Sequence, residues 1–167
     1  MQTRKAPGAV SALAAVFLFV LCGASSSVFA VGGYEDPPPS ATKTPGAADL
    51  ARGRAALTHK DWPEAVNAFE KVVALEPRNA DAWNWLAYAN RKNGKLDAAF
   101  KYYDKALSLD PKHRGAYEYQ GEAFLMARQL AKAENNLATL AKLCNSSCEE
   151  YVELKEAIAN YKAGKKP

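Results

Sequence analysis

The chain repeats a pattern of small and apolar residues every 34 positions, and this period limits the possible folds more than any other feature. An alanine, an aromatic residue, a leucine and a proline recur in that order, as Ala65, Phe69, Leu75 and Pro77 and then as Ala99, Tyr103, Leu109 and Pro111. A unit of this length holds two helices, which cannot bury their apolar faces without a neighbouring unit. We therefore predict an all-α solenoid built by stacking such units.

Further residues keep the same period and indicate the type of repeat. Gly53, Ala87 and Gly121 recur at this interval, as do Trp83 and Tyr117. By these residues the chain resembles the tetratricopeptide repeat (TPR) family. The resemblance implies a right-handed α-solenoid of about three helix-turn-helix repeats with a C-terminal capping helix. It also implies a protein that binds other proteins and is not an enzyme.

The repeats set the expected domain boundaries. We place them at about residues 47–79, 80–113 and 114–145, with a capping helix at about 147–163 and a basic tail at 164–167. Asp61 and Glu64 have the spacing of a capping box, and Ser147 and Glu150 predict a second one before the last helix. We expect the charged residues of the capping helix to form its solvent-facing side: Glu149, Glu150, Glu153, Glu156 and Lys162.

The N-terminal segment 1–30 has the pattern of a secretory signal peptide. Arg4 and Lys5 precede an uncharged apolar run that is too short to span a bilayer, and Ala30 is a suitable last residue before cleavage. We predict a mature chain that begins at Val31 and has no membrane span; a retained membrane anchor is the alternative. Residues 31–46 hold four prolines and three glycines, which favours a disordered tether. We expect the periplasm of a Gram-negative bacterium rather than the extracellular space.

The charge of the mature chain argues against a nucleic-acid partner. Removal of residues 1–30 leaves 20 lysine and arginine residues against 18 aspartate and glutamate residues, a net charge of +2. These charges are scattered along the chain, whereas nucleic-acid-binding proteins concentrate basic residues in a stripe or patch. We predict a protein or peptide partner and no nucleic acid, for a chain that is a monomer or a weak homo-oligomer.

Two cysteines, Cys144 and Cys148, remain after export, and they flank the last helix junction. In an oxidising compartment an even pair of cysteines is most simply a disulfide. A redox-active dithiol is the alternative, although the spacing is Cys-x3-Cys rather than Cys-x-x-Cys. No further ligands lie near the pair in sequence, so we predict no metal site.

The sequence offers no constellation for catalysis. His59 and His113 both fall in turns without a neighbouring cluster of ligands, so we interpret both as solvated turn residues. We find no Ser/His/Asp arrangement, no phosphate-binding glycine loop and no pair of carboxylates in an evidently apolar pocket. The prediction is a non-enzymatic protein without a cofactor.

The resemblance implies that the first helix of each repeat lines a concave binding groove. The candidate groove residues are Arg54, Asn84, Trp85, Tyr88, Arg91, Glu118, Tyr119 and Glu122. Within this set we predict an aromatic floor of Trp85, Tyr88 and Tyr119. Arg54 and Arg91 are expected toward one end of the floor, and Glu118 and Glu122 toward the other. The alternative for Trp85 and Tyr119 is packing between adjacent repeats.

A carboxylate clamp of lysine, arginine and asparagine holds acidic chaperone tails in some members of the family. At the corresponding positions this chain has Leu50, Arg54, Trp85, Gly115 and Tyr119, so we predict that it lacks clamp recognition. The function hypothesis is a non-catalytic module that binds a protein or peptide in an exported compartment. Two alternatives stay open: an assembly factor of an envelope complex that uses its convex face, and a thiol-disulfide enzyme that uses its two remaining cysteines.

Overall fold

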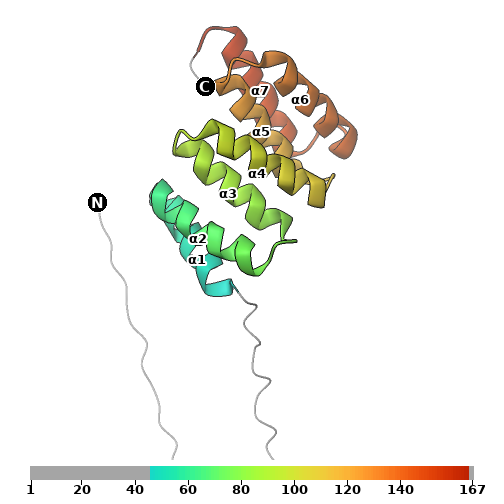
Figure 1. Cartoon of the computed structure of the whole chain (residues 1–167). Coiled ribbons are helices and arrows are strands. Elements are labelled where there is room, and N and C mark those ends of the chain that lie inside the picture. Colours follow the sequence, from blue (N-terminus) through green and yellow to red (C-terminus); the bar gives the residue numbers. More distant parts are fainter. Residues whose placement is uncertain (1–45, 166–167) are drawn as a thin grey trace, which may run out of the picture. The chain divides into compact units, whose positions relative to one another are not determined.

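The computed structural model describes residues 46–165, which form seven α-helices and no strand (Figure 1). The helices are α1 (Ala47–Thr58), α2 (Trp62–Leu75), α3 (Ala80–Lys92), α4 (Leu96–Leu109), α5 (Arg114–Met126), α6 (Leu130–Cys144) and α7 (Glu149–Lys162). The predicted all-α fold is therefore confirmed. The predicted signal peptide, the tether up to residue 45 and the last two residues of the basic tail lie outside the described residues.

Local sequence explains where several helices begin and end. The side chain of Asp61 accepts a hydrogen bond from the backbone N–H of Glu64 at 3.2 Å, as the capping box predicts. Asn79 caps α3 in the same way, with 3.0 Å from its Oδ1 to the backbone nitrogen of Ala82. Gly94 adopts a left-handed conformation with φ of 80°, which ends α3 at little steric cost.

The helices pack as consecutive antiparallel pairs: α1 with α2, α3 with α4, and α5 with α6. Each pair contacts the next through α2 and α3 or through α4 and α5, and α7 packs on both α5 and α6. α3 also contacts α5 directly. The first helices of successive pairs therefore lie side by side along one face, and α7 continues that row.

Apolar side chains form one cluster at each of the three levels of the stack. Phe69 is fully buried between α1, α2 and α3, Tyr103 in the middle level, and Leu154 between α5, α6 and α7. This division matches a solenoid, in which each unit buries its apolar face against its neighbours.

Two glycines permit close helix approach. A Cβ atom at Gly53 would lie 2.8 Å from the ring of Phe69 in the same repeat, as expected for a helix crossing within one unit. A Cβ atom at Gly121 would lie 2.6 Å from the methyl groups of Leu154 on α7. The glycine of the third repeat therefore admits the capping helix α7.

The junction before α7 differs from the prediction. Ser147 does not cap α7: its Oγ donates to the carbonyl oxygen of Cys144 at 2.8 Å, and the N-cap residue is Cys148, without a side-chain cap hydrogen bond. The reason is local, since Asn145 and Ser146 both have positive φ and turn Ser147 back toward α6. Cys144 and Cys148 lie against each other across this junction, with their Cα atoms 5.7 Å apart, a separation that suits the predicted disulfide.

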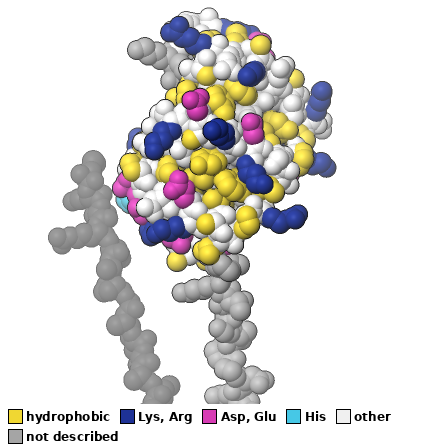
Figure 2. Space-filling view, viewed as in Figure 1, with side chains coloured by type: hydrophobic (Ala, Val, Ile, Leu, Met, Phe, Trp, Pro, Cys, Tyr) yellow, Lys and Arg dark blue, Asp and Glu magenta, His cyan; other side chains and the backbone are white. Residues whose placement is uncertain are grey.

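None of the helices within residues 46–165 has the length and apolar character needed to cross a bilayer. On the face shown in Figure 2, lysine and arginine side chains are spread singly among acidic and apolar ones. Hydrophobic side chains gather over the middle of that face.

Candidate functional site

Three aromatic side chains meet on the face formed by the first helices of the repeats. Trp85 and Tyr88 come from α3 and Tyr119 from α5. The ring centroids of Tyr88 and Tyr119 are 4.9 Å apart, and those of Trp85 lie 6.1 Å from Tyr88 and 6.2 Å from Tyr119. All three side chains are half-buried. We call this set the aromatic cluster; it packs between neighbouring repeats and also presents a surface.

The aromatic cluster lines a hollow of about 620 Å³, the aromatic recess. Its other wall is the last part of α1, with Arg54, Leu57 and Thr58. Burial raises the pKa of Tyr88 and, together with the nearby Glu118, that of Tyr119, so both phenols stay neutral at physiological pH. The recess thus offers apolar ring faces, neutral hydroxyl groups and one exposed guanidinium.

Arg91 and Glu122 do not lie at opposite ends of the groove, so that prediction is wrong. The guanidinium of Arg91 pairs with the carboxylate of Glu122 at 2.6 Å, and Arg91 is only 6% exposed. It also lies 5.1 Å from the ring centroid of Tyr88 and 5.8 Å from that of Tyr119. The pair forms because α3 and α5 are adjacent, and together with the two rings it supports the aromatic cluster from behind.

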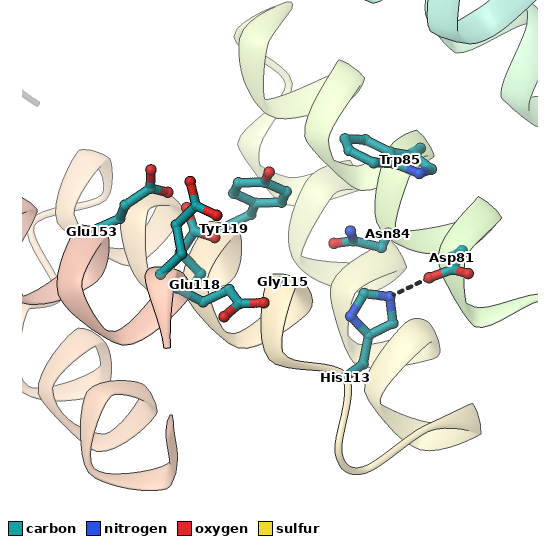
Figure 3. A pocket seen from close by; sticks show the side chains of 10 residues that line it. Asp81, Asn84, Trp85, His113, Gly115, Glu118, Tyr119 and Glu153 are labelled. Carbon is teal, nitrogen blue, oxygen red and sulfur yellow. Dashed lines mark ion pairs between the residues drawn. The ribbon is translucent and has the colours of Figure 1, made fainter. Parts of the chain in front are cut away.

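A second hollow of about 350 Å³ lies beside the first, between α3, α5 and α7 (Figure 3). We call it the acidic recess. It is lined by Asp81, Asn84, Trp85, His113, Gly115, Glu118, Tyr119, Glu149, Glu150 and Glu153. Three of these glutamates belong to the start of α7; Glu149 and Glu153 are exposed, as predicted, and Glu150 is half-buried. Trp85 and Tyr119 line both recesses.

Glu118 is a buried carboxyl group rather than a solvated acidic end of the groove. Its residue is 4% exposed, and burial, followed by the neighbouring carboxyl group of Glu153, raises its pKa to about 9. Figure 3 shows the two side chains facing each other from α5 and α7. At neutral pH Glu118 is therefore protonated, and a carboxyl pair exists that sequence reasoning did not find.

His113 is not a solvated turn residue as predicted. Its Nδ1 accepts a hydrogen bond from the backbone N–H of Ala116 at 3.1 Å, so the histidine caps α5. The side chain is 12% exposed, and its Nε2 lies 3.0 Å from Oδ1 of Asp81. The cap therefore fixes the ring at the rim of the acidic recess (Figure 3).

Asn84 has a buried amide oxygen without a partner. The residue is 3% exposed, and its Oδ1 makes no hydrogen bond within the described part of the chain. Its side chain lies between Trp85 and His113 with the amide group turned toward the acidic recess (Figure 3). A buried polar atom without a hydrogen-bond partner costs free energy. A hydrogen bond from a ligand N–H or O–H group to this oxygen would remove that cost.

The repeat pattern has a match among known families. Residues 50–114 match the family model described as Tetratricopeptide repeat. The chain is therefore similar to this family over α1 to α4 and shares its all-α fold. Proteins with TPR repeats are in general interaction modules without catalytic activity.

The chain is also similar in sequence to one curated protein and in fold to solved TPR domains, all at low identity. Superkiller protein 3 of Saccharomyces cerevisiae is 24% identical over 98 residues, which are 59% of this chain but only 7% of that protein. The TPR2B-domain:pHsp70 complex of yeast Sti1 has a TM-score of 0.64 at 22% identity, covering 72% of this chain and 98% of that one. The second TPR domain of human RPAP3, in complex with the HSP70 peptide SGPTIEEVD, has a TM-score of 0.62 at 20% identity, covering 70% and 94%.

Six of the eight candidate groove residues line one recess or the other, and the remaining two form the ion pair behind the rings. Sequence reasoning missed the contribution of Asp81, His113 and the start of α7. Asn79 and His113 are N-cap residues of first helices one repeat period apart, which was a usable signal for His113. Within residues 46–165 no group of three His, Cys, Asp or Glu side chains is arranged to hold a metal ion.

Proposed function

We propose that this TPR domain is a non-catalytic binding module that takes an extended segment of a partner protein along the face formed by α1, α3 and α5. The observation that carries the proposal is the aromatic recess, where three half-buried rings adjoin an exposed arginine. Aromatic and arginine side chains supply much of the energy of protein interfaces when a partner covers them.

The bound peptide in the RPAP3 complex, SGPTIEEVD, carries three acidic residues and no basic one. This chain keeps only Arg54 among the clamp positions, and acidic side chains line the neighbouring recess. We therefore propose that the ligand of this domain is not an acidic tail, because like charges across an interface disfavour binding.

We further propose that the protein works in an exported compartment, the periplasm in particular. Support comes from Arg4, Lys5 and the apolar run that ends at Ala30, and from a cysteine pair placed to form a disulfide. N-terminal sequencing of the protein recovered from the periplasm should begin at Val31. Recovery of an intact Met1 in the cytoplasm would count against export.

The aromatic recess is tested by Tyr88→Ala, measured on a peptide identified by in-cell crosslinking to the wild-type protein. We expect affinity to fall by about 2 kcal/mol, a loss of roughly 30-fold, because a central ring is removed from the interface. Tyr161→Ala on α7 is the matched control, since it removes a half-buried ring outside both recesses. Circular dichroism must show that both variants keep their helical content.

The same experiment separates the alternatives. Normal binding by folded Tyr88→Ala would overturn the groove proposal. Hydrogen exchange with the captured partner then decides what replaces it: protection of α2, α4 and α6 supports an assembly factor that uses the convex face. Exchange of Cys144 or Cys148 into a mixed disulfide supports the thiol-disulfide alternative.

A further inference from the structure

The acidic recess combines negative charge, an unsatisfied oxygen atom and two aromatic walls in one hollow. We propose that it binds the guanidinium group of an arginine side chain in the partner segment. This inference rests on the proposed function, because the recess adjoins the aromatic recess through their common side chains Trp85 and Tyr119.

The charge of the recess favours a cation. Five carboxyl groups line it: Asp81, Glu118, Glu149, Glu150 and Glu153. Among the described residues two basic groups pair with these carboxyl groups: His113, whose Nε2 is 3.0 Å from Oδ1 of Asp81, and Arg114, whose Nε is 3.4 Å from Oε1 of Glu150. Within that same part of the chain Glu149 and Glu153 have no such counterpart, so a cation that enters the recess neutralises charge that the fold leaves uncompensated.

An independent observation points to a hydrogen-bond donor on the ligand. Oδ1 of Asn84 is buried, has no hydrogen-bond partner among residues 46–165 and borders the recess. Helical packing positions it, because Asn84 stands one turn after the first residues of α3 and is held between Trp85 and the turn that carries His113 (Figure 3). A ligand N–H that reaches this oxygen removes the cost of an unpaired acceptor.

The aromatic walls distinguish arginine from lysine. A guanidinium is planar, stacks on aromatic faces and presents several N–H donors in a fixed plane, whereas an ammonium is a compact and strongly hydrated charge. Trp85 and Tyr119 provide the ring faces, and the amide oxygen and the carboxylates provide acceptors at the edge of the plane. The geometry therefore suits the guanidinium better than the ammonium.

Binding should be linked to a proton. Glu118 is protonated at neutral pH, since its pKa is raised to about 9, and a cation beside it favours the carboxylate. The titratable groups that line the recess with it or act on its pKa are Asp81 from α3, Tyr119 and Glu122 from α5, Glu149, Glu150 and Glu153 from α7, and His113 from the preceding turn. Arginine binding is thus expected to tighten as the pH rises from 6 toward 9.

The test selects binders from a library of random 12-residue peptides on the folded mature chain, on Glu149→Gln/Glu153→Gln, and on Glu156→Gln. The last variant is the matched control, because it makes the same change on an exposed residue of α7 outside the recess. We expect the wild type and the control to enrich arginine at one peptide position. The double variant should still select peptides but without that enrichment.

One selected peptide is then made with citrulline, an uncharged isostere, in place of its arginine. We expect the wild type to lose affinity roughly tenfold and the double variant less than twofold. This comparison on the wild type does not depend on the folding of any variant.

Three results would overturn the inference, and they are distinguishable. If the selected peptides contain no basic residue, the proposed binding function still holds but the proposed arginine site is contradicted. If lysine is enriched as strongly as arginine, the site binds a cation but does not prefer the guanidinium group. If the wild-type protein is folded by circular dichroism but selects no peptide at all, both the proposed binding function and the proposed arginine site are contradicted.

Discussion

The aromatic recess and the acidic recess share two side chains but arise from different parts of the chain. The aromatic recess is built by the first helices of three successive repeats, where Arg54 and Tyr88 hold equivalent positions one period apart. The acidic recess takes three of its carboxyl groups from α7, which follows the last repeat. Repetition thus predicts one hollow, while the other depends on how the capping helix docks.

The two hollows also differ in how their charged groups are paired. In the first, the charge of Arg91 is buried and paired with Glu122 behind the rings. In the second, carboxyl groups face one another and Glu118 keeps a proton. The buried charge on the aromatic side is paired within the fold, whereas Glu149 and Glu153 on the acidic side have no ion-pair partner among the described residues.

The largest expected effect comes from breaking the ion pair between Arg91 and Glu122. Glu122→Ala leaves the Arg91 charge buried without its partner and should lower the free energy of unfolding by about 3 kcal/mol in urea denaturation. Glu149→Ala in the acidic recess is the control and should change it by less than about 0.5 kcal/mol, because it removes a charge without an ion-pair partner among the described residues. Equal losses for the two variants would contradict the distinction.

The next effect tests whether the acidic side depends on the docking of α7. Replacing Cys144 and Cys148 with serine should lower the free energy of unfolding by about 2 kcal/mol, since the closed loop is short. Hydrogen exchange should become faster in α7 and stay unchanged in α1 to α4. Titration that finds both thiols free in the exported protein would show the disulfide prediction to be wrong.

The smallest expected effect concerns the proton on Glu118. The folded-state pKa of Glu118 is raised to about 9, so its contribution to stability is present below about pH 4.5 and is lost as the pH rises toward 9. A glutamine at this position cannot ionise. Between pH 5 and pH 9 the free energy of unfolding of Glu118→Gln should therefore fall by at least about 1 kcal/mol less than that of the wild type. Melting temperatures across that range provide the measurement, with the exposed Glu70→Gln as control. Parallel pH profiles for wild type and Glu118→Gln would contradict the raised pKa.

The fold could be predicted because each repeat carries the same packing residues. Residues such as Ala65 and Ala99 mark the same helix crossing in successive units, and both are fully buried. The aromatic cluster followed from the same register, since Tyr88 and Tyr119 lie on adjacent first helices. Helix periodicity determines such neighbours without further information.

The rest required contacts that the period does not specify. The missing side chain of Gly121 admits Leu154, and this packing of α7 on α5 brings Glu153 to Glu118. The ion pair of Arg91 joins residues that are not equivalent in their repeats, so the comparison of equivalent positions did not reveal it. The cap formed by His113 depends on a ring orientation that residue type alone does not indicate.

Trp85 and Tyr119 form a wall that belongs to both hollows. A ligand group that turns either ring on one side reshapes the other side at the same time. Such a movement would link the occupancies of the two hollows thermodynamically, and each ligand would change the affinity of the other by the same factor. A segment that fills both would bind cooperatively, with the shared wall acting as the coupling element between its two anchors.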